Sequence, residues 1–576
     1  MPAKRKKKVE KVEEEKREEK PWYKFWPPGV RKHIDYPEVP LHEFLRNSAQ
    51  KYPNKTAIIY FDKKITYKEL DVLSDKFATA LADLGVKKGD RVAIFLPNIP
   101  QFVISYYGTL KAGAVVTAIS PLYKEREVEH QLNDSEAETI IVLDLLYPIV
   151  EKVWGKTKLR NVVVASLKDY MPKFKAVLGS LLKKVPSRKV ERKANVYFFK
   201  ELMVKYEAKP PKVEINPRED LAALQYTGGT TGISKGAMLT HMNLVSNAVM
   251  CREWLQASEG EEVVLTVLPL FHIYGMTTSM NAPIFFAGTM VLLPRFDPVS
   301  VLQAIHKYRV TVFCGAPTMY AMLLAHPDLK KYDCTSIKFC VSGAAPLPPE
   351  VQKKFMEVTG GVLVEGYGLT ESSPVTHANP LDKTMKTVKI GSIGIPWPDT
   401  DAKIVDLETG EKELPPGEVG ELIVKGPQVM RGYWKMPEET AAVLRNGWLY
   451  TGDIGKMDED GYFYIVDRKK DMIIAGGYNI YPRVEEGLYE HPAVLEAAVI
   501  GIPDPYRGET VKAFIQLRPE YKGKVTAGEI IKFCKNKLAP YKVPDIVEFR
   551  DELPKSLVGK ILRRVLKEEE LAKLKK

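Results

Sequence analysis

The residues that could do chemistry first gather in one glycine- and threonine-rich stretch, Tyr226 to Gly236. It reads YTGGTTGISKG, follows an apolar run at 221–224, and precedes a helical pattern that starts near Met242. Glycines let backbone N–H groups approach phosphate oxygens, and threonine hydroxyls add donors or metal ligands. Lys235 adds a positive charge. The stretch therefore predicts a loop, between a strand and a helix, that wraps an anion.

This loop differs from the P-loop of nucleotide kinases. That motif needs a glycine, four residues, and then Gly-Lys followed by Ser or Thr. Here Ile233 stands five residues after Gly228, and Lys235 is followed by Gly236. The alternative is a flexible surface linker, which would gain nothing from an ordered Thr-Thr-Gly and a lysine. The pattern favours anion binding and leaves the anion unidentified.

A second polar stretch, Glu365 to Glu371, follows an apolar strand at 361–364 and reads EGYGLTE. The flat side chain of Tyr367 could stack on a purine. The carboxylate of Glu371 could hold Mg²⁺, which prefers oxygen ligands and keeps several waters. A lone glutamate after a turn is equally suited to capping a helix, so this stretch by itself leaves both roles open.

Three later stretches carry isolated charges. Asp453 is expected at a strand end, where its carboxylate could grip two ribose hydroxyls, although a turn-forming aspartate fits equally well. The charge cluster 467–471 is typical of a solvated linker. Lys560 follows a glycine turn near the end of the sequence and, taken alone, would be an exposed surface lysine.

The elements that must position these residues alternate between helix and strand. We expect helices at 41–52, 67–84, 100–112, 301–308, 484–489 and 527–538. We expect strands at 57–61, 91–96, 114–118, 138–143, 160–165, 263–268, 289–293, 310–314, 337–341, 421–424, 493–500 and 510–517. Strand, helix and strand at this spacing predict a parallel sheet covered by helices.

The sequence pattern changes after about residue 390, where glycines and prolines separate short segments with the composition of β-strands. Such a pattern is typical of a small barrel or meander. The expected fold class is α/β, with a large N-terminal domain at 21–466 made of mixed sheets and helices and including this β-rich subdomain. A linker at 467–470 leads to a small α+β C-terminal domain at 471–576, which ends in a basic tail. Residues 1–20 are expected to be a charged flexible tail.

Composition sets limits on function. The chain has 576 residues, a net charge of +12 and five cysteines without a C-x-x-C pair. The charge favours anionic ligands such as nucleotides, or a membrane surface, and is weak evidence for nucleic acid, for which no binding module is visible. The cysteines indicate buried thiols in a reducing compartment.

Two segments bear on membranes and targeting. Residues 1–20 contain no apolar core of a signal peptide, so a cytoplasmic location is expected. The segment 263–294 lacks Asp, Glu, Lys and Arg, but prolines and glycines interrupt it, which favours buried interior over a membrane span. The aromatic residues at 22–26 are expected to pack on the protein rather than touch lipid.

Taken together and in order, these stretches resemble the adenylate-forming superfamily of acyl-CoA synthetases, firefly luciferase and adenylation domains. The resemblance covers about residues 40–565 and is closest to medium- and long-chain fatty acid–CoA ligases. It is carried by the stretches 225–241, 268–272 and 366–371, which match the motifs of that family in residue identity as well as in spacing.

The resemblance implies a role for each matching position. It implies catalytic roles for Lys560, Thr370, Glu371 and His272. It implies ATP or AMP binding by Thr227, Gly228, Gly229, Thr230, Thr231, Lys235, Gly343, Ala344, Ala345, Glu365, Gly366, Tyr367, Gly368, Thr370, Asp453, Arg468 and Lys560. It implies an acyl pocket at His272, Tyr274, Met276, Gly343 and Gly368, and a CoA tunnel at Gly476, Gly477 and Tyr478. It implies Mg²⁺ ligands in Thr230 and Glu371, and a hinge at Lys470 for a mobile C-terminal domain.

The implied activity is activation of a fatty acid by ATP through an acyl-AMP intermediate, with transfer of the acyl group to CoA. The implied cofactors are ATP, Mg²⁺ and CoA, and the partners are these small molecules, with no nucleic acid. Tyr274 and Met276 stand where some long-chain relatives have a tryptophan, so acyl chain length stays open. Peripheral membrane association and a homodimer also stay open.

Three other functions stay open beside this one. The chain could activate an aryl or short-chain acid, load acyl groups onto a carrier protein, or bind acyl groups or nucleotides without catalysis. A relative that binds these molecules without catalysis would be expected to lack Lys560, Glu371 or Asp453, and all three are present.

Overall fold

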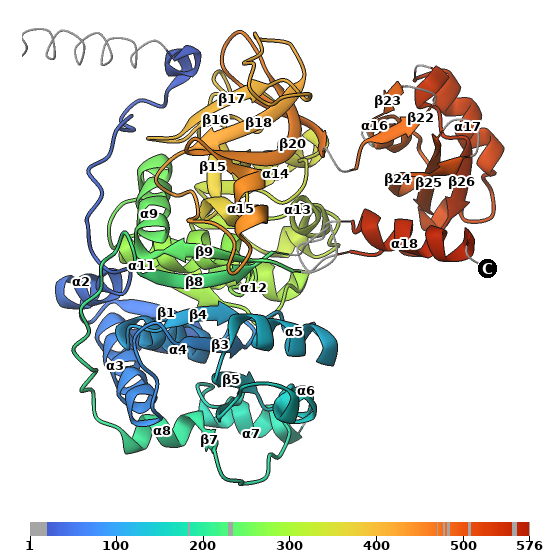
Figure 1. Cartoon of the computed structure of the whole chain (residues 1–576). Coiled ribbons are helices and arrows are strands. Elements are labelled where there is room, and N and C mark those ends of the chain that lie inside the picture. Colours follow the sequence, from blue (N-terminus) through green and yellow to red (C-terminus); the bar gives the residue numbers. More distant parts are fainter. Residues whose placement is uncertain are drawn as a thin grey trace, which may run out of the picture. The chain divides into compact units, whose positions relative to one another are not determined.

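The structure is a computed structural model that describes residues 20–181, 185–227, 234–468, 471–475, 478–480, 484–504, 508–538, 540–555 and 561–574 (Figure 1). It divides into two compact units. The larger unit comprises Lys24–Asp401 and Lys425–Leu449, and the smaller comprises Met1–Tyr23, Ala402–Val424 and Tyr450–Lys576. The predicted hinge falls within the smaller unit, with Lys469 and Lys470 outside the described residues, so the predicted domain boundaries stay predictions.

The larger unit contains a seven-stranded sheet. Its order is β7 (Val196–Phe198), β6 (Asn161–Ala165), β5 (Thr139–Leu143), β3 (Arg91–Phe95), β4 (Val115–Ala118), β8 (Leu221–Tyr226) and β9 (Gly236–Thr240). Neighbours are parallel except for β8 and β9, which pair antiparallel. The predicted parallel sheet is therefore confirmed, with one antiparallel edge strand added.

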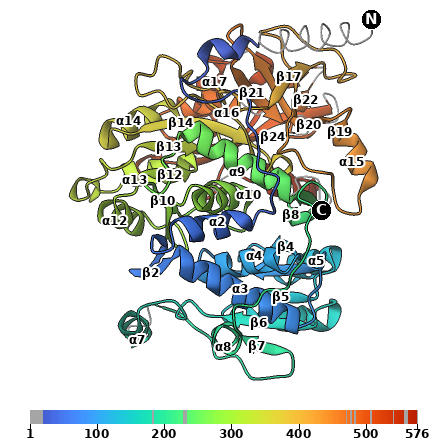
Figure 2. The ribbon, with the colours of Figure 1, turned by 90° about the vertical axis from the view of Figure 1, so that its left-hand side faces the viewer.

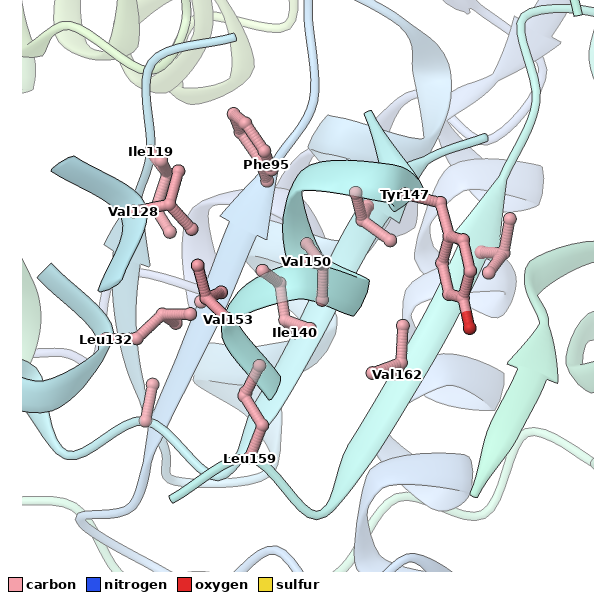
Figure 3. Close-up of a cluster of buried hydrophobic side chains, with 14 of the residues drawn as sticks. Phe95, Ile119, Val128, Leu132, Ile140, Tyr147, Val150, Val153, Leu159 and Val162 are labelled. Atoms are coloured by element: carbon pink, nitrogen blue, oxygen red, sulfur yellow. The ribbon is translucent and has the colours of Figure 1, made fainter. Parts of the chain in front are cut away.

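Helices bury the faces of this sheet. Figure 3 shows Ile140 and Val162 from β5 and β6 packed with Val150 and Val153 of α6 (Tyr147–Val153). Helix α4 (Pro100–Lys111) packs on β3 and β4 and on α3 (Tyr67–Asp83), as Figure 2 shows. These strands are buried along nearly their whole length, which explains their continuous apolar sequence.

A nine-stranded sheet forms the rest of the larger unit's core. Its order is β16 (Ile395–Pro396), β15 (Val375–Ala378), β14 (Val362–Gly368), β13 (Phe339–Ser342), β12 (Val312–Gly315), β10 (Val263–Thr266), β11 (Thr289–Leu292), β1 (Thr56–Tyr60) and β2 (Lys63–Thr66). The strands from β14 to β1 pair parallel, while β15, β16 and β2 pair antiparallel at the two margins.

Helix ends follow local sequence signals. Thr66 and Glu69 form a capping box at the start of α3, where the Thr66 N–H donates to the Glu69 carboxylate at 2.7 Å. Thr240 caps α9 (His241–Leu255) in the same way with Asn243. These caps satisfy backbone N–H groups that have no partner within the helix.

The uncharged segment 263–294 is protein interior, as predicted. It forms β10, α10 (Ile273–Met276), η3 (Thr277–Asn281), α11 (Ala282–Phe285) and β11, and most of its side chains are buried. Within the part of the chain that the structure describes, no helix is long and apolar enough to span a bilayer. Trp22 is 4% exposed and Trp26 contacts Trp254, so the prediction that these aromatics pack on the protein is confirmed.

The strands that follow form a five-stranded sheet of order β17 (Asp401–Val405), β18 (Gly420–Lys425), β20 (Trp448–Met457) and β19 (Leu444–Arg445), with β21 (Phe463–Arg468) paired to β20. A second sheet has the order β23 (Tyr478–Ile480), β22 (Ile473–Ala475), β25 (Gly508–Leu517) and β24 (Val494–Asp504), with β26 (Ile546–Phe549) paired to β25. Helices α16 (Val484–Tyr489), α17 (Ala527–Lys535) and α18 (Arg563–Leu574) accompany this second sheet.

The basic tail predicted after the helix at 527–538 includes a further helix, because Arg563–Leu574 forms α18. Leu566 is fully buried against Ala498 and Phe514 of the sheet. A few apolar residues within a charged segment give a weak periodic signal, and contact with the sheet stabilises the helix.

Candidate active site

The glycine- and threonine-rich loop connects the two antiparallel strands β8 and β9. Tyr226 pairs with Gly236, and the Thr227 N–H donates to the Lys235 carbonyl oxygen at 2.9 Å. The predicted change from strand directly to helix is wrong, because β9 precedes α9. Ala237 and Leu239 are fully buried, and this alternation suits a strand. Gly228, Gly229, Thr230 and Thr231 lie outside the described residues, so their roles stay predictions.

Lys235 lies at the base of this loop and makes two contacts. Its ammonium group forms an ion pair with Glu439 of α15 (Pro437–Val443), and it lies 5.2 Å from the centroid of the Tyr433 ring. A cation above an aromatic face is attracted by the ring's quadrupole. The positive charge predicted for phosphate binding is therefore held next to the segment that contains Tyr433.

Glu371 is held by that same segment at two points. The Tyr433 hydroxyl donates to Glu371 Oε1 at 2.6 Å, and the Met430 N–H donates to the Glu371 carbonyl oxygen at 2.7 Å. Burial, followed by the charge of Glu371, raises the pKa of Tyr433 well above its usual value, so its hydroxyl keeps the proton it donates. Glu371 is the middle residue of the single turn η5 (Thr370–Ser372), between Thr370 and a buried Ser372.

Sequence reasoning missed Tyr433 as a site residue. It lies in a glycine-punctuated stretch that was expected to be a β-rich subdomain, and its partner is 62 residues away. Its aromatic type and its polar end offered no more than a weak signal.

Two glycines near the end of strand β14 stand where side chains have no room. A Cβ atom at Gly368 would lie 2.2 Å from the Pro374 carbonyl oxygen, and one at Gly366 would lie 2.8 Å from Val341. Strands β13 and β14 are parallel, with Ser342 beside Glu365, so their carboxyl ends meet at one edge of the sheet. The structure thus brings the predicted residues 343–345 and 365–371 together.

The predicted adenine-binding residues lie around this edge. Tyr367 is half-buried, and its ring meets His377 edge-on at 6.0 Å between centroids. Ala344 is exposed and has a φ of 71°, a left-handed conformation that is uncommon for a residue with a side chain. Such strain concentrates at functional sites because surrounding structure must maintain it.

The residues predicted for the acyl pocket are also neighbours. His272 Nδ1 accepts a hydrogen bond from the Tyr274 N–H at 3.2 Å, at the start of α10. The Tyr274 hydroxyl donates to the Val341 carbonyl oxygen at 2.8 Å, and a Cβ atom at Gly343 would lie 3.1 Å from the Tyr274 ring. Met276 is fully buried. The close pairing of Tyr274 with Gly343 links α10 to the end of β13.

Two buried amide side chains missed by sequence reasoning link the two sheets. Asn98, after β3, accepts from the Leu270 N–H and donates to the Leu268 carbonyl oxygen, both at 2.8 Å. Gln225 of β8 donates to the Phe271 carbonyl oxygen at 2.8 Å. The segment before His272 is therefore held by the ends of two strands of the seven-stranded sheet. A polar residue three positions after the end of an apolar strand was the available signal for Asn98.

In the smaller unit, Asp453 lies within β20 and is 4% exposed, so its predicted place at a strand end is wrong. Within this strand Gly452 adopts a φ of 70°, which glycine tolerates, and its N–H donates to Glu421 Oε1 at 3.0 Å. Asp453 stands opposite Arg468 of β21 in the strand register, so the two residues predicted to contact the ribose are paired positions.

Several predicted residues cannot be placed. Lys560, Gly476, Gly477 and Lys470 lie outside the described residues. The loop that contains Lys560 is closed by an antiparallel bridge between Lys555 and Ile561, and the Leu562 N–H donates to the Pro554 carbonyl oxygen at 2.8 Å. Tyr478 begins β23. Among the residues that the structure does describe, no group of three His, Cys, Asp or Glu side chains could hold a metal.

Comparison with known proteins identifies the family. The pattern of the AMP-binding enzymes matches residues 45–434, and that of the AMP-binding enzyme C-terminal domain matches residues 483–560. The chain is 52% identical over 562 residues to a long-chain-fatty-acid–CoA ligase of Bacillus subtilis, covering 96% of this chain and 98% of the relative.

Two solved structures are similar along nearly their whole length. ATP-bound MatB from Rhodopseudomonas palustris has a TM-score of 0.79 and 31% identity, over 92% of this chain and 99% of that one. The anthranilate–CoA ligase AuaEII in complex with anthranoyl-AMP has a TM-score of 0.82 and 29% identity, over 94% and 98%. With both family patterns matched in order and a relative at 52% identity, the chain belongs to the family of AMP-binding enzymes.

Proposed function

We propose that this protein is an AMP-forming ligase that joins a long-chain fatty acid to CoA at the expense of ATP. The observation that carries this proposal is the 52% identity, over almost the whole length of both chains, to a long-chain-fatty-acid–CoA ligase. The ATP-bound and acyl-AMP-bound states of two structural relatives support the same chemistry.

The first half-reaction joins the carboxylate to AMP. A carboxylate oxygen attacks the α-phosphorus of ATP, and the bond to the β-phosphate oxygen breaks, releasing pyrophosphate. Two anions must meet, and negative charge collects on the phosphate oxygens, so positive charge and N–H donors aimed at them lower the barrier. In this proposal the loop 227–235 with Lys235 holds the departing phosphates, while Thr370 and Lys560 face the α-phosphate.

The chemistry of Glu371 fits a magnesium ion. Its carboxylate supplies oxygen donors, and the Tyr433 hydrogen bond fixes one of them in place. Mg²⁺ is commonly held by one or two carboxylates together with substrate phosphates, and Glu371 with Thr230 would suffice for that. When bound there, the ion would neutralise charge on the phosphates. Asp453 and Arg468 are proposed to grip the ribose.

In the second half-reaction the thiol sulfur of CoA attacks the acyl carbonyl carbon, the bond to AMP breaks, and the thiol proton is released. Lys560 and the glycines 476–477 belong to one C-terminal segment but serve different half-reactions. We therefore propose that residues 471–576 rotate between the steps about Lys470, relative to an N-terminal domain that ends near residue 466.

The proposed acyl site consists of His272, Tyr274, Met276, Gly343 and Gly368. The described residues around it are mainly apolar, which suits a fatty acyl chain. The alternative substrate is an aryl acid, because AuaEII is an anthranilate–CoA ligase. We leave membrane contact and oligomeric state outside this assignment.

The substrate is tested by acid-dependent exchange between ATP and labelled pyrophosphate. Saturated fatty acids of increasing length should support exchange far better than anthranilate, benzoate, malonate or acetate. Preference for an aryl or short-chain acid would replace the fatty acid in the proposal. No exchange with any acid, despite binding of ATP, would indicate a silent relative.

The role of Lys560 is tested by separating the half-reactions. Lys560→Ala should slow adenylate formation by about 100- to 1000-fold, as losses of transition-state charge partners do, and largely spare thioester formation from synthetic acyl-AMP. Lys555→Ala is the matched control, since Lys555 lies at the base of the same loop and pairs with Glu496 at 2.6 Å. Equal loss in both half-reactions would contradict the assignment.

A further inference from the structure

Helix α7 (Lys173–Leu181) presents exposed apolar side chains. Phe174 is 67% exposed and Val177 is 60% exposed. Phe174 and Val177 follow the spacing i and i+3, which places them on one face of the helix. Figure 2 shows α7 at the margin of the larger unit. Large exposed apolar groups that lie side by side are typical of an interaction site.

The same segment is strongly basic. Between residues 173 and 189 the sequence has six basic residues and no acidic one: Lys173, Lys175, Lys183, Lys184, Arg188 and Lys189. Among the described positions, Lys173, Arg188 and Lys189 are exposed to solvent. The exposed Lys173 therefore adjoins Phe174, in a segment of the sequence that is uniformly basic.

The turn between β1 and β2 extends this surface. The Lys175 ammonium forms an ion pair with Asp62 in that turn, which holds α7 beside it. Phe61 is 41% exposed, and the next residues, Lys63 and Lys64, are exposed as well. The combined region, named here the α7 surface, consists of Phe61, Lys63, Lys64, Lys173, Phe174 and Val177.

This combination selects among partners. A nucleic acid would contact the lysines but leave the two aromatic rings and Val177 in water. An anionic bilayer satisfies both features, because apolar side chains enter the boundary between headgroups and acyl chains while lysines stay with the phosphates. Lysine stems can lie along apolar surface with their charges in water, which suits Lys173 beside Phe174.

We propose that the α7 surface docks this protein peripherally on a bilayer that contains anionic phospholipid. The site is formed within the larger unit alone and does not include the residues proposed for catalysis. It stands independently of the ligase proposal, because its evidence is exposure and charge rather than family membership.

Vesicle co-sedimentation of the full chain tests the proposal. The protein should sediment with vesicles of phosphatidylglycerol and phosphatidylcholine, much less with phosphatidylcholine alone, and less again at high salt. The double variant Phe174→Glu, Val177→Glu should weaken the partition by about tenfold or more. The triple variant Lys63→Glu, Lys64→Glu, Lys173→Glu should weaken it by about tenfold or more as well.

The control is Met322→Glu, which adds one negative charge at a 51% exposed apolar residue on α13 (Pro317–Leu324). Met322→Glu should bind vesicles as strongly as the unaltered chain does. All variants should unfold at the same temperature as the unaltered chain. The proposal is overturned if the chain binds neither vesicle, binds both equally, or loses nothing with the double variant. Binding to duplex DNA that depends on the lysines but not on Phe174 would reassign the surface. None of these readouts involves catalysis, so their failure would leave the ligase proposal intact.

Discussion

Two hairpins carry many of the residues predicted to bind ATP, and distant segments hold them to different extents. Strands β8 and β9 flank the glycine- and threonine-rich loop at the margin of the seven-stranded sheet. Strands β14 and β15 flank the turn with Glu371 near the margin of the nine-stranded sheet. Each hairpin adds an antiparallel strand to a sheet that is otherwise mainly parallel.

The described part of the β8–β9 connection is held by its own residues and by two distant side chains, since Lys235 pairs with Glu439 and the Ser234 carbonyl oxygen lies 3.2 Å from His130 Nε2. Thr227 pairs with Lys235 through the backbone, and the Ser234 hydroxyl donates to the Thr227 carbonyl oxygen. These contacts span eight residues of sequence.

The β14–β15 turn is held by distant segments. Thr277 donates to the Ser373 carbonyl oxygen at 2.7 Å, and the Asn247 amide exchanges two hydrogen bonds with the backbone of Val375. Tyr433 and Met430 hold Glu371 from a third segment. A carboxylate that must stand at one place benefits from such preorganised contacts.

Glycine substitutions should separate the two hairpins most strongly. Gly368→Ala should lower the free energy of unfolding by about 3 kcal/mol and impair activity, because the added Cβ atom would meet backbone. Gly236→Ala in β9 should cost less than about 1 kcal/mol, since its Cβ atom would lie 3.2 Å from the Tyr226 side chain, which can shift. Urea unfolding measures both, and equal costs would contradict the difference in rigidity.

Low pH should destabilise the fold at both hairpins to a similar extent, because a buried histidine lies in or next to each of them. Burial lowers the pKa of His241, which follows β9, and of His377 in β15, to about 3 in each case. Below the ordinary pKa near 6.5 the unfolded chain binds protons that the folded chain does not, so the free energy of unfolding falls as pH falls towards 3. At pH 5 the loss should be about 2 kcal/mol for each histidine.

His241→Asn should remove about 2 kcal/mol of that acid loss and keep an acceptor for the Leu41 N–H, which donates to His241 Nδ1 at 3.0 Å. Urea unfolding at pH 7.5 and pH 5 measures the change. Identical pH dependence in the variant and the unaltered chain would show that His241 does not stay neutral when folded.

Tyrosine substitutions should distinguish positioning from stability. Tyr433→Phe removes the donor to Glu371 and should slow adenylate formation by about tenfold while raising the Mg²⁺ concentration needed for half-maximal rate. Tyr226→Phe in β8 is the control, since it removes a hydrogen bond to Asp134 of 2.5 Å. Both variants should lose stability, and only Tyr433→Phe should change the Mg²⁺ dependence. The same Mg²⁺ dependence in both would remove Tyr433 from the site.

The smallest effect is expected at the base of the phosphate loop. Glu439→Gln removes the ion-pair partner of Lys235, with which ATP phosphates would have to compete, and should tighten ATP binding by about two- to fivefold. Glu438→Gln removes the same charge from the neighbouring exposed residue and should change little. Calorimetric titration with ATP at low and moderate salt measures both. Weaker ATP binding in Glu439→Gln would mean that Glu439 positions Lys235 instead of competing for it.

The sequence by itself predicted the elements with strong periodicity and the chemistry with strong local composition. Helix α3 and strand β3 appear within one or two residues of their predicted ends, because apolar spacing directly reflects a buried face. The anion-binding character of 227–235 follows from glycines, threonines and a lysine within nine residues. Both signals depend on residues that lie close together in the sequence, so a single sequence is enough to detect them.

Only the tertiary structure decided which distant groups support the site. Tyr433 reaches Glu371 across 62 residues, and Asn98 reaches Leu270 across 172. Strand β9 and helix α18 likewise depend on the surfaces against which they pair or pack. Local patterns record how a segment alternates between core and solvent, whereas a hydrogen bond between distant segments depends on the sheet order that brings them together.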